Sequence, residues 1–267
     1  MEIKRLKLKK LNNTRDLGGL PAADGKTIKY GKLIRSGRIS EIPDCTAQSL
    51  KDLGLKTVVD LRIETERNEH PSRQIDGVEF IWLPLLCTAT AGITREKSMA
   101  KTMYKESKRI KEEFGSADNY MIETYKNILT NPNTIPALKE FLNIVINHED
   151  GALLWHCSGG KDRAGICAML VEALLGVPDE VIILDYVSTQ RFQRRKYFLS
   201  KFGLKVVPMS RYFKAILYGL MDARKIFILS TIEFLEARYG SVVDYCKQEL
   251  GITDEQIALL RQKYLED

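Results

Sequence analysis

The chain has 267 residues, 44% of them hydrophobic, and carries a formal net charge of +6. This composition supports one large core, so we expect a single domain over residues 1–267, and no apolar run reaches the roughly 20 residues that cross a bilayer. The basic N-terminus, MEIKRLKLKKLNN, lacks the apolar core of about 7–15 residues that a secretory signal needs. We expect a cytoplasmic protein; export stays open, because a signal removed beforehand would leave no trace in the sequence.

Four apolar segments rich in β-branched and aromatic residues predict strands. They cover residues 32–36, 56–61, 78–84 and 151–156. Between the first two, residues 45–54 predict a short helix, with Thr46 as its N-cap and Gly54 as its C-terminal stop.

The remaining sequence is helical in pattern. Residues 87–134 are polar and predict a helical insertion without a strand, and residues 134–149 have apolar residues at helical spacing. After Gly165 the helical pattern continues to the end. Strands that alternate with helices early, followed by helices alone, predict an α/β fold with a central, mostly parallel sheet flanked by helices.

The cysteines and histidines give little support to a disulfide framework or a metal centre. The five cysteines are widely scattered, no Cys-x-x-Cys pair occurs, and there are three histidines. We therefore expect no metal and no organic cofactor.

The segment WHCSGGKDRAG (155–165) places one cysteine and two glycines between a strand and a helix. If the helix begins near Arg163, the preceding backbone N–H groups form a concave ring that binds a tetrahedral oxyanion. Cys157 lies at the base of this ring, where the N–H groups and the helix dipole stabilise a thiolate, and the Arg163 guanidinium offers two donors to phosphate. The predicted phosphate-binding residues are Ser158, Gly159, Gly160, Lys161, Asp162 and Arg163.

The arrangement Cys-x5-Arg, preceded by His156 and followed by a helix, resembles the cysteine-dependent protein tyrosine phosphatases, and most closely the bacterial branch with the loop HCxxGKDR. NNTRDLGGL (12–20), LIRSGRIS (33–40), VVDLRIETER (58–67) and the tail 236–265 are similar to further segments of that branch. The resemblance implies the phosphatase fold and tyrosine-protein phosphatase activity, with phosphoserine, phosphothreonine or phosphoinositides as further substrates of some members.

The resemblance also implies roles for individual residues. Cys157 is the expected nucleophile and Arg163 the phosphate clamp, while His156 orients the loop or supports the thiolate. The segment 82–92 lacks the aspartate that most of the wider superfamily uses as general acid. In the bacterial branch that this chain resembles, the loop aspartate carries that role, so the resemblance implies Asp162 as the acid. The alternatives are a bracing role for Asp162, with Glu112, Glu113 or Asp118 as the acid.

The sequence leaves the roles of two residues in this segment undecided. Lys161 is either an ordinary solvated lysine or a second cation at the rim that attracts multiply charged substrates. Ala164 replaces the serine or threonine that relatives usually carry after the arginine, so hydrolysis of the phosphoenzyme should be slower unless Ser158 compensates.

Other polar residues have simpler expected roles. Asp60 and Arg62 should form an internal ion pair at a strand end, and Arg15 and Asp16 are candidates for bracing the site. Cys167 and Cys87 are expected to be core residues, with a protective disulfide as the less favoured reading.

Positive charge is concentrated in residues 186–221, which contain eight Lys or Arg and no Asp or Glu. This favours a local anionic partner over general nucleic-acid coating. The resemblance suggests a helical lid here, open to transient contact with an anionic membrane surface; the alternative is two ordinary amphipathic helices.

We therefore expect a phosphatase that acts on a phosphotyrosine-containing protein or a phosphoinositide, releases inorganic phosphate and binds no nucleic acid. The alternatives are a phosphoinositide or inositol-phosphate phosphatase and, in a different class, a phospho-residue binding module with little turnover.

Overall fold

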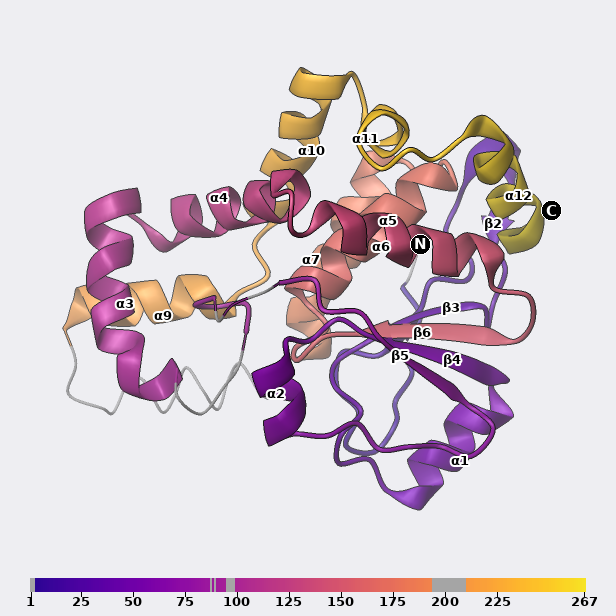
Figure 1. The fold of residues 1–267 in the computed structure, drawn as a ribbon, viewed down its shortest axis with the longest axis horizontal. Helices are drawn as coiled ribbons and strands as arrows, with labels where there is room; N and C mark the ends of the chain where they lie inside the picture. Colours follow the sequence, from indigo (N-terminus) through magenta and orange to yellow (C-terminus); the bar gives the residue numbers. More distant parts are fainter. Residues whose placement is uncertain (1–2, 87, 89, 95–98, 194–209) are drawn as a thin grey trace.

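The computed structural model describes residues 3–86, 88, 90–94, 99–193 and 210–267. A five-stranded sheet organises the fold (Figure 1), with the strand order β1-β3-β6-β4-β5. β1 is antiparallel to β3 and the other pairs are parallel, which confirms the predicted mostly parallel sheet. The strands are β1 (Arg15–Asp16), β3 (Leu33–Ser36), β4 (Leu55–Asp60), β5 (Glu79–Trp82) and β6 (Ala152–His156).

The four predicted strands all form, within one or two residues of their expected ends. The two-residue strand β1 and the antiparallel pair β2 (Thr27–Ile28) and β7 (Leu265–Glu266) are additional. Segments of two residues are too short to show an alternating pattern, so their pairing depends on the surrounding fold.

Helices cover both faces of the sheet. On one face α1 packs over Leu154, and on the other α5 and α6 pack over Leu153 and Trp155, as the alternation of a strand requires. The first helices are α1 (Asp44–Asp52), α2 (Glu64–Glu69), α3 (Met99–Phe114), α4 (Ala117–Thr130) and α5 (Ile135–Asn147). The later ones are α6 (Asp162–Leu174), α7 (Asp179–Phe192), α9 (Arg211–Met221), α10 (Lys225–Tyr239), α11 (Val242–Gln248) and α12 (Asp254–Tyr264).

The predicted helical insertion, residues 87–134, contains α3 and α4 and extends away from the sheet (Figure 1). α4 packs against both α9 and α10, so this part of the chain and the C-terminal half form one helical layer. The basic stretch 186–221 begins inside α7, where Tyr186 and Phe192 are buried in the core. Its middle part, residues 194–209, lies outside the described residues.

Two local expectations need correction. Thr46 does not cap α1: the helix begins at Asp44 after Pro43, and the Thr46 hydroxyl donates instead to the Lys9 carbonyl. The short helix α2 was not expected, because its sequence, ETERNE, has no apolar residue to give a helical pattern. Gly54 does end α1, in the left-handed conformation typical of a helix stop.

α6 is the central helix, and every one of its residues is buried. This burial extends to charged side chains at both ends of the helix, which must therefore find partners inside the protein. Among the described helices, none has the length and hydropathy that a membrane crossing requires.

Candidate active site

Three parallel strands end in one row at the carboxyl edge of the sheet. Ser36 of β3 lies opposite His156 of β6, which lies opposite Asp60 of β4. The chain leaving β6 forms a loop over Cys157–Lys161, and α6 begins at Asp162. The loop therefore lies at a helix N-terminus, where backbone N–H groups and the helix dipole favour an anion.

Glycine is required at one position of this loop. Gly160 has φ +64°, and a Cβ atom there would lie 2.6 Å from backbone atoms of Ser36 and Gly37. The close approach turns the Gly160 N–H toward Cys157, to whose Sγ it donates a hydrogen bond at 3.2 Å. This is an interaction that favours a thiolate.

Arg163 is fully buried and held by Glu66 of α2. Its Nη1 and Nη2 lie 2.7 and 3.0 Å from the two oxygens of the Glu66 carboxylate, a bidentate pair. Burial acts to lower the pKa of Arg163, but Glu66 and Cys157 raise it above its usual value, so the guanidinium stays charged. Its buried Nε has no hydrogen-bond partner among the described residues.

Glu66 also accepts a hydrogen bond from the Ser158 hydroxyl, so one carboxylate ties both ends of the loop to α2. Glu66 was not among the site residues predicted from the sequence. The available signal was an acidic cluster directly after a strand whose carboxyl end meets the loop, but nothing in that cluster distinguished Glu66 from Glu64.

A second set of buried polar groups holds the loop through its carbonyl oxygens. The Asn13 amide donates to Gly159 O and Gly160 O at 3.1 and 2.8 Å. Arg35 Nη2 donates to Gly160 O and Lys161 O at 3.1 and 3.2 Å. With the carbonyl groups turned outward, the N–H groups are left for the inside of the ring.

Asp185 of α7 is the counterion of this set. Its carboxylate pairs with both Arg15, at 2.5 Å, and Arg35, and all three side chains are buried. Arg15 is thus a brace, as the sequence suggested, although burial and the neighbouring Arg35 lower its pKa to about 10. Burial and Asp185 raise the pKa of the adjacent Glu172 well above its usual value, which favours its protonated form.

His156 and Asp60 stabilise the strand ends below the loop. The Nδ1 of His156 lies 3.4 Å from Cys157 O, and burial lowers the pKa of its imidazole. The predicted ion pair between Asp60 and Arg62 is confirmed, with two hydrogen bonds of 2.9 and 2.7 Å. Burial opposes ionisation of Asp60, but His156 and Arg62 lower its pKa to about 2.

Lys161, considered as a cation at the rim, is buried. Its Nζ donates to Leu220 O and Asp222 O at the end of α9, at 2.8 and 3.2 Å. The carbonyl groups of a helix C-terminus carry partial negative charge, which explains this position of the ammonium group. The same Nζ lies 3.2 Å from Asp162 Oδ1.

Asp162 accepts a second contact at the same oxygen, from the Tyr125 hydroxyl at 2.5 Å. Tyr125 in turn lies 2.7 Å from the Tyr186 hydroxyl, and both rings are buried. Burial and Asp162 raise the pKa of Tyr125, which therefore remains protonated and donates.

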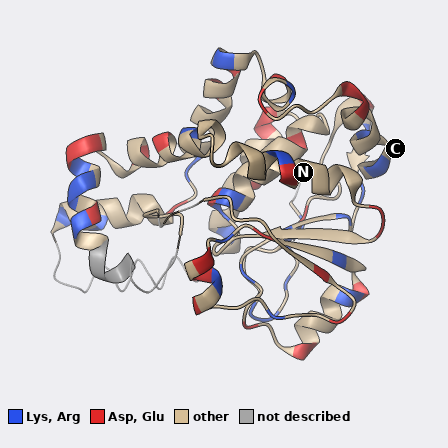
Figure 2. Cartoon of the chain, viewed as in Figure 1, with Lys and Arg blue, Asp and Glu red and all other residues tan. Residues whose placement is uncertain are grey.

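The alternative acids each have a nearby basic partner. Glu112 and Glu113 pair with Lys108 and Arg109 within α3, at the end of the molecule remote from the sheet, where Figure 2 shows acidic and basic residues interleaved. Asp118 of α4 pairs with Arg224 at 2.6 Å.

Cys167 and Cys87 are the two further cysteines that were expected to be core residues. Cys167 is buried in the core, and burial raises the pKa of its thiol; Cys87 lies outside the described residues. Among the described residues, no group of His, Cys, Asp and Glu is arranged to hold a metal ion.

Known proteins are similar to this chain over most of its length. A family model described as the tyrosine phosphatase family matches residues 6–266. A Cupriavidus necator protein named "Putative tyrosine-protein phosphatase" is 30% identical over 261 residues, 96% of this chain and 86% of that protein. The "Triple specificity protein phosphatase PtpB" of Mycobacterium tuberculosis is 24% identical over 269 residues, 93% of this chain and 95% of that protein. A tyrosine-protein phosphatase of Nostoc commune is 26% identical over 172 residues, 64% of this chain and 53% of that protein.

The chain combines an α/β fold with a carboxyl-edge loop that has a cysteine at its base and a buried arginine at its end. The chain belongs to the tyrosine phosphatase family. It is a hydrolase of phosphoric monoesters, and its substrate is phosphorylated.

The buried cluster predicts a stability effect. Replacing Asp185 by Asn leaves two buried guanidinium groups without their carboxylate, and we expect unfolding free energy to fall by about 3–5 kcal/mol. Urea denaturation followed by circular dichroism measures this. The control Glu180→Gln, on the exposed side of the same helix, should change it by less than about 0.5 kcal/mol. A loss below about 1 kcal/mol for Asp185→Asn would show that Glu172 ionises and replaces the counterion.

Proposed function

We propose that the chain, acting as one domain over residues 1–267, hydrolyses phosphotyrosine in proteins through a phosphocysteine intermediate on Cys157. The observation that carries the proposal is the convergence of Cys157 Sγ, the Gly160 N–H and the charged Arg163 at one helix N-terminus. A phosphoryl group in this ring has a nucleophile below it and donors around its oxygens, which is what phosphoryl transfer to sulfur requires.

In the first step the Cys157 thiolate attacks phosphorus and forms an S–P bond while the bond to the leaving oxygen breaks. Asp162 gives its proton to that oxygen. In the second step water attacks phosphorus and gives a proton to the Asp162 carboxylate, the S–P bond breaks, inorganic phosphate is released, and the Cys157 thiolate is regenerated. Charge that moves onto the equatorial oxygens in both steps is stabilised by the loop N–H groups and Arg163.

The contacts of Asp162 indicate which oxygen carries the proton. Tyr125 and Lys161 both engage Oδ1, so Oδ2 is the oxygen that faces the proton transfer.

A phosphoinositide or inositol phosphate is the second candidate substrate. The observation that favours it is the similarity to the Mycobacterium tuberculosis protein, whose name records triple specificity. A binding module without turnover is less well supported, because it would not need a cysteine under the anion site.

The free thiols fit the reducing conditions of the cytoplasm, where we place the activity.

The covalent mechanism predicts that Cys157→Ser lowers turnover by about four orders of magnitude or more, because a serine hydroxyl at this site has no base to activate it. Phosphate release from a phosphotyrosine peptide measures this, and vanadate binding by calorimetry should persist. Cys45→Ser, at an exposed cysteine of α1, is the matched control and should retain full activity. Substantial activity of Cys157→Ser would rule out the phosphocysteine intermediate.

A second prediction concerns the acid. If Asp162 protonates the leaving oxygen, Asp162→Asn should slow aryl phosphates with basic leaving groups by about 10²–10⁴-fold and those with acidic leaving groups much less. A series of substituted phenyl phosphates gives the dependence of kcat/KM on leaving-group pKa, with Asp118→Asn as control. Equal losses across the series would make Asp162 a structural brace of the loop.

A third prediction concerns Ala164, which has no hydroxyl to stabilise the departing sulfur. The Ser158 hydroxyl donates to Glu66 and does not replace it. A hydrogen bond to a charged group contributes about 1.5–3 kcal/mol, which corresponds to roughly 10- to 100-fold in the second step. We expect a burst of the aryl product followed by slow turnover, and Ala164→Ser should raise the slow rate and shrink the burst.

Stopped-flow measurement on an aryl phosphate tests this, with Ala168→Ser, one helical turn further along α6, as the control for a buried hydroxyl. Absence of a burst in the wild type, together with no gain from Ala164→Ser, would mean that the sulfur departs with the help of another group.

A further inference from the structure

A chain of buried hydroxyl groups ends at the carboxyl group of Asp162. The Tyr125 hydroxyl lies 2.5 Å from Asp162 Oδ1 and 2.7 Å from the Tyr186 hydroxyl. Tyr125 is fully buried and Tyr186 is 1% exposed, so bulk water does not compete for either contact. The two tyrosines belong to α4 and α7, and the chain therefore connects Asp162 to two helices outside the phosphate loop.

The chain has one direction of donation, because each hydroxyl carries a single proton. Oδ1 of Asp162 accepts from Tyr125. The Tyr125 oxygen then has only lone pairs left for its second contact, so Tyr186 is the donor there. The order of donation is Tyr186 to Tyr125 to Asp162.

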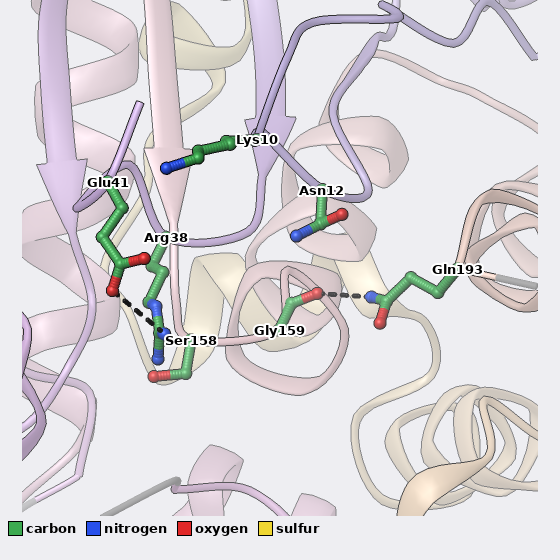
Figure 3. Close-up of a pocket in the computed structure, with 7 residues that line it drawn as sticks. All are labelled: Lys10, Asn12, Arg38, Glu41, Ser158, Gly159 and Gln193. Atoms are coloured by element: carbon green, nitrogen blue, oxygen red, sulfur yellow. Dashed lines mark hydrogen bonds and ion pairs between the residues drawn. The ribbon is translucent and has the colours of Figure 1, made fainter. Parts of the chain in front are cut away.

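α7 holds Tyr186 at a fixed position relative to the loop. The preceding residue, Asp185, pairs with Arg35, which donates to the loop carbonyl groups. At the end of the helix, the Gln193 amide donates to Gly159 O at 2.7 Å, a contact that Figure 3 shows. Tyr186 thus lies on the stretch of α7 between two attachments to the loop.

The contacts of Asp162 make its two oxygens unequal. Oδ1 accepts from Tyr125 and also lies 3.2 Å from Lys161 Nζ. An oxygen that accepts from two donors has its lone pairs occupied, so a transferable proton is carried by Oδ2. A hydroxyl that holds Oδ1 in place therefore also sets the direction in which Oδ2 points.

We propose that Tyr125 and Tyr186 are positioning residues for proton transfer, which hold Asp162 with Oδ2 directed at the leaving oxygen. The proposal rests on the proposed function, in which Asp162 is the general acid. Both tyrosines act through the orientation of this one carboxyl group. Without the Tyr125 hydroxyl, the carboxyl group is free to rotate about its Cβ–Cγ bond, and the proton is shared between its two oxygens.

Tyr125→Phe tests the proposal, because it removes one hydroxyl and keeps the buried ring. The measurement is kcat/KM for a series of substituted phenyl phosphates, which reports phosphoryl transfer to Cys157 and not the second step. A hydrogen bond to a charged group corresponds to roughly 10- to 100-fold in rate, so we expect a loss of about tenfold for basic leaving groups. Acidic leaving groups depart without a proton and should lose much less.

The chain offers a matched control on the same helix. The Tyr245 hydroxyl is also fully buried, and it donates to Leu129 O near the end of α4 at 2.7 Å. Tyr245→Phe therefore removes an equally buried hydroxyl from a contact with α4 that does not include Asp162. This variant should leave the whole series unchanged, whereas a general loosening of α4 would affect both variants.

Two further variants show whether the effect passes along the chain. In Asp162→Asn no acid remains to be positioned, so adding Tyr125→Phe should cause no further loss. Tyr186→Phe should give the same leaving-group pattern with a smaller loss, because it acts on Asp162 only through Tyr125. Thermal unfolding is measured for each variant, and if Tyr125→Phe unfolds below the assay temperature, the series for Tyr186→Phe decides.

Three results would overturn the positioning role: an equal loss across the series in Tyr125→Phe, the same loss in Tyr245→Phe, or a full further loss when Tyr125→Phe is added to Asp162→Asn. Failure of the proposed function gives a different result. If Asp162→Asn itself slows all leaving groups equally, Asp162 is not the acid and the positioning role falls with it. If Asp162→Asn shows the expected dependence and Tyr125→Phe does not, the positioning role alone is wrong.

Discussion

The structure of the active site depends on one buried carboxylate, Asp185, that neutralises two buried arginines. Arg35 holds the carbonyl oxygens of the loop, and Arg15 holds Asn13, which binds the same stretch of backbone. A loop whose carbonyl groups are fixed from outside keeps its N–H groups directed inward without rearrangement when an anion binds. Preorganisation of this kind is the main source of electrostatic stabilisation in enzymes.

The loop is also connected to the helical layer. Lys161 is bonded to the last carbonyl groups of α9, and Asp162 is bonded to Tyr125 of α4, so the two residues that precede Arg163 contact helices that pack on each other. A displacement of α9 would therefore remove the partners of Lys161 and change the charge next to Asp162. Residues from both halves of the chain therefore determine the electrostatic environment of the Asp162 carboxyl group.

Much of the fold could be predicted from the sequence, because the relevant signals are local. Four strands, the helix at 135–147 and the turn between β6 and α6 follow from apolar spacing, glycine and the short distance between Cys157 and Arg163. The order of the strands and the positions of β1, β2 and β7 depend on pairing between distant segments, which no local pattern records. The predicted N-cap of α1 was wrong for a similar reason, because the Thr46 hydroxyl donates to a carbonyl group that is remote in sequence.

For the site, the sequence by itself determined the loop, because a cysteine, a glycine that tolerates positive φ and an arginine must lie within a few residues of one another. Only the tertiary structure decided what surrounds them. Glu66 and Asp185 are 97 and 22 residues away from Arg163, and each becomes a partner of the site because burial of charge requires a counterion. The position of Lys161 was decided in the same way, since a helix end 59 residues later offers its ammonium group better acceptors than water at the rim.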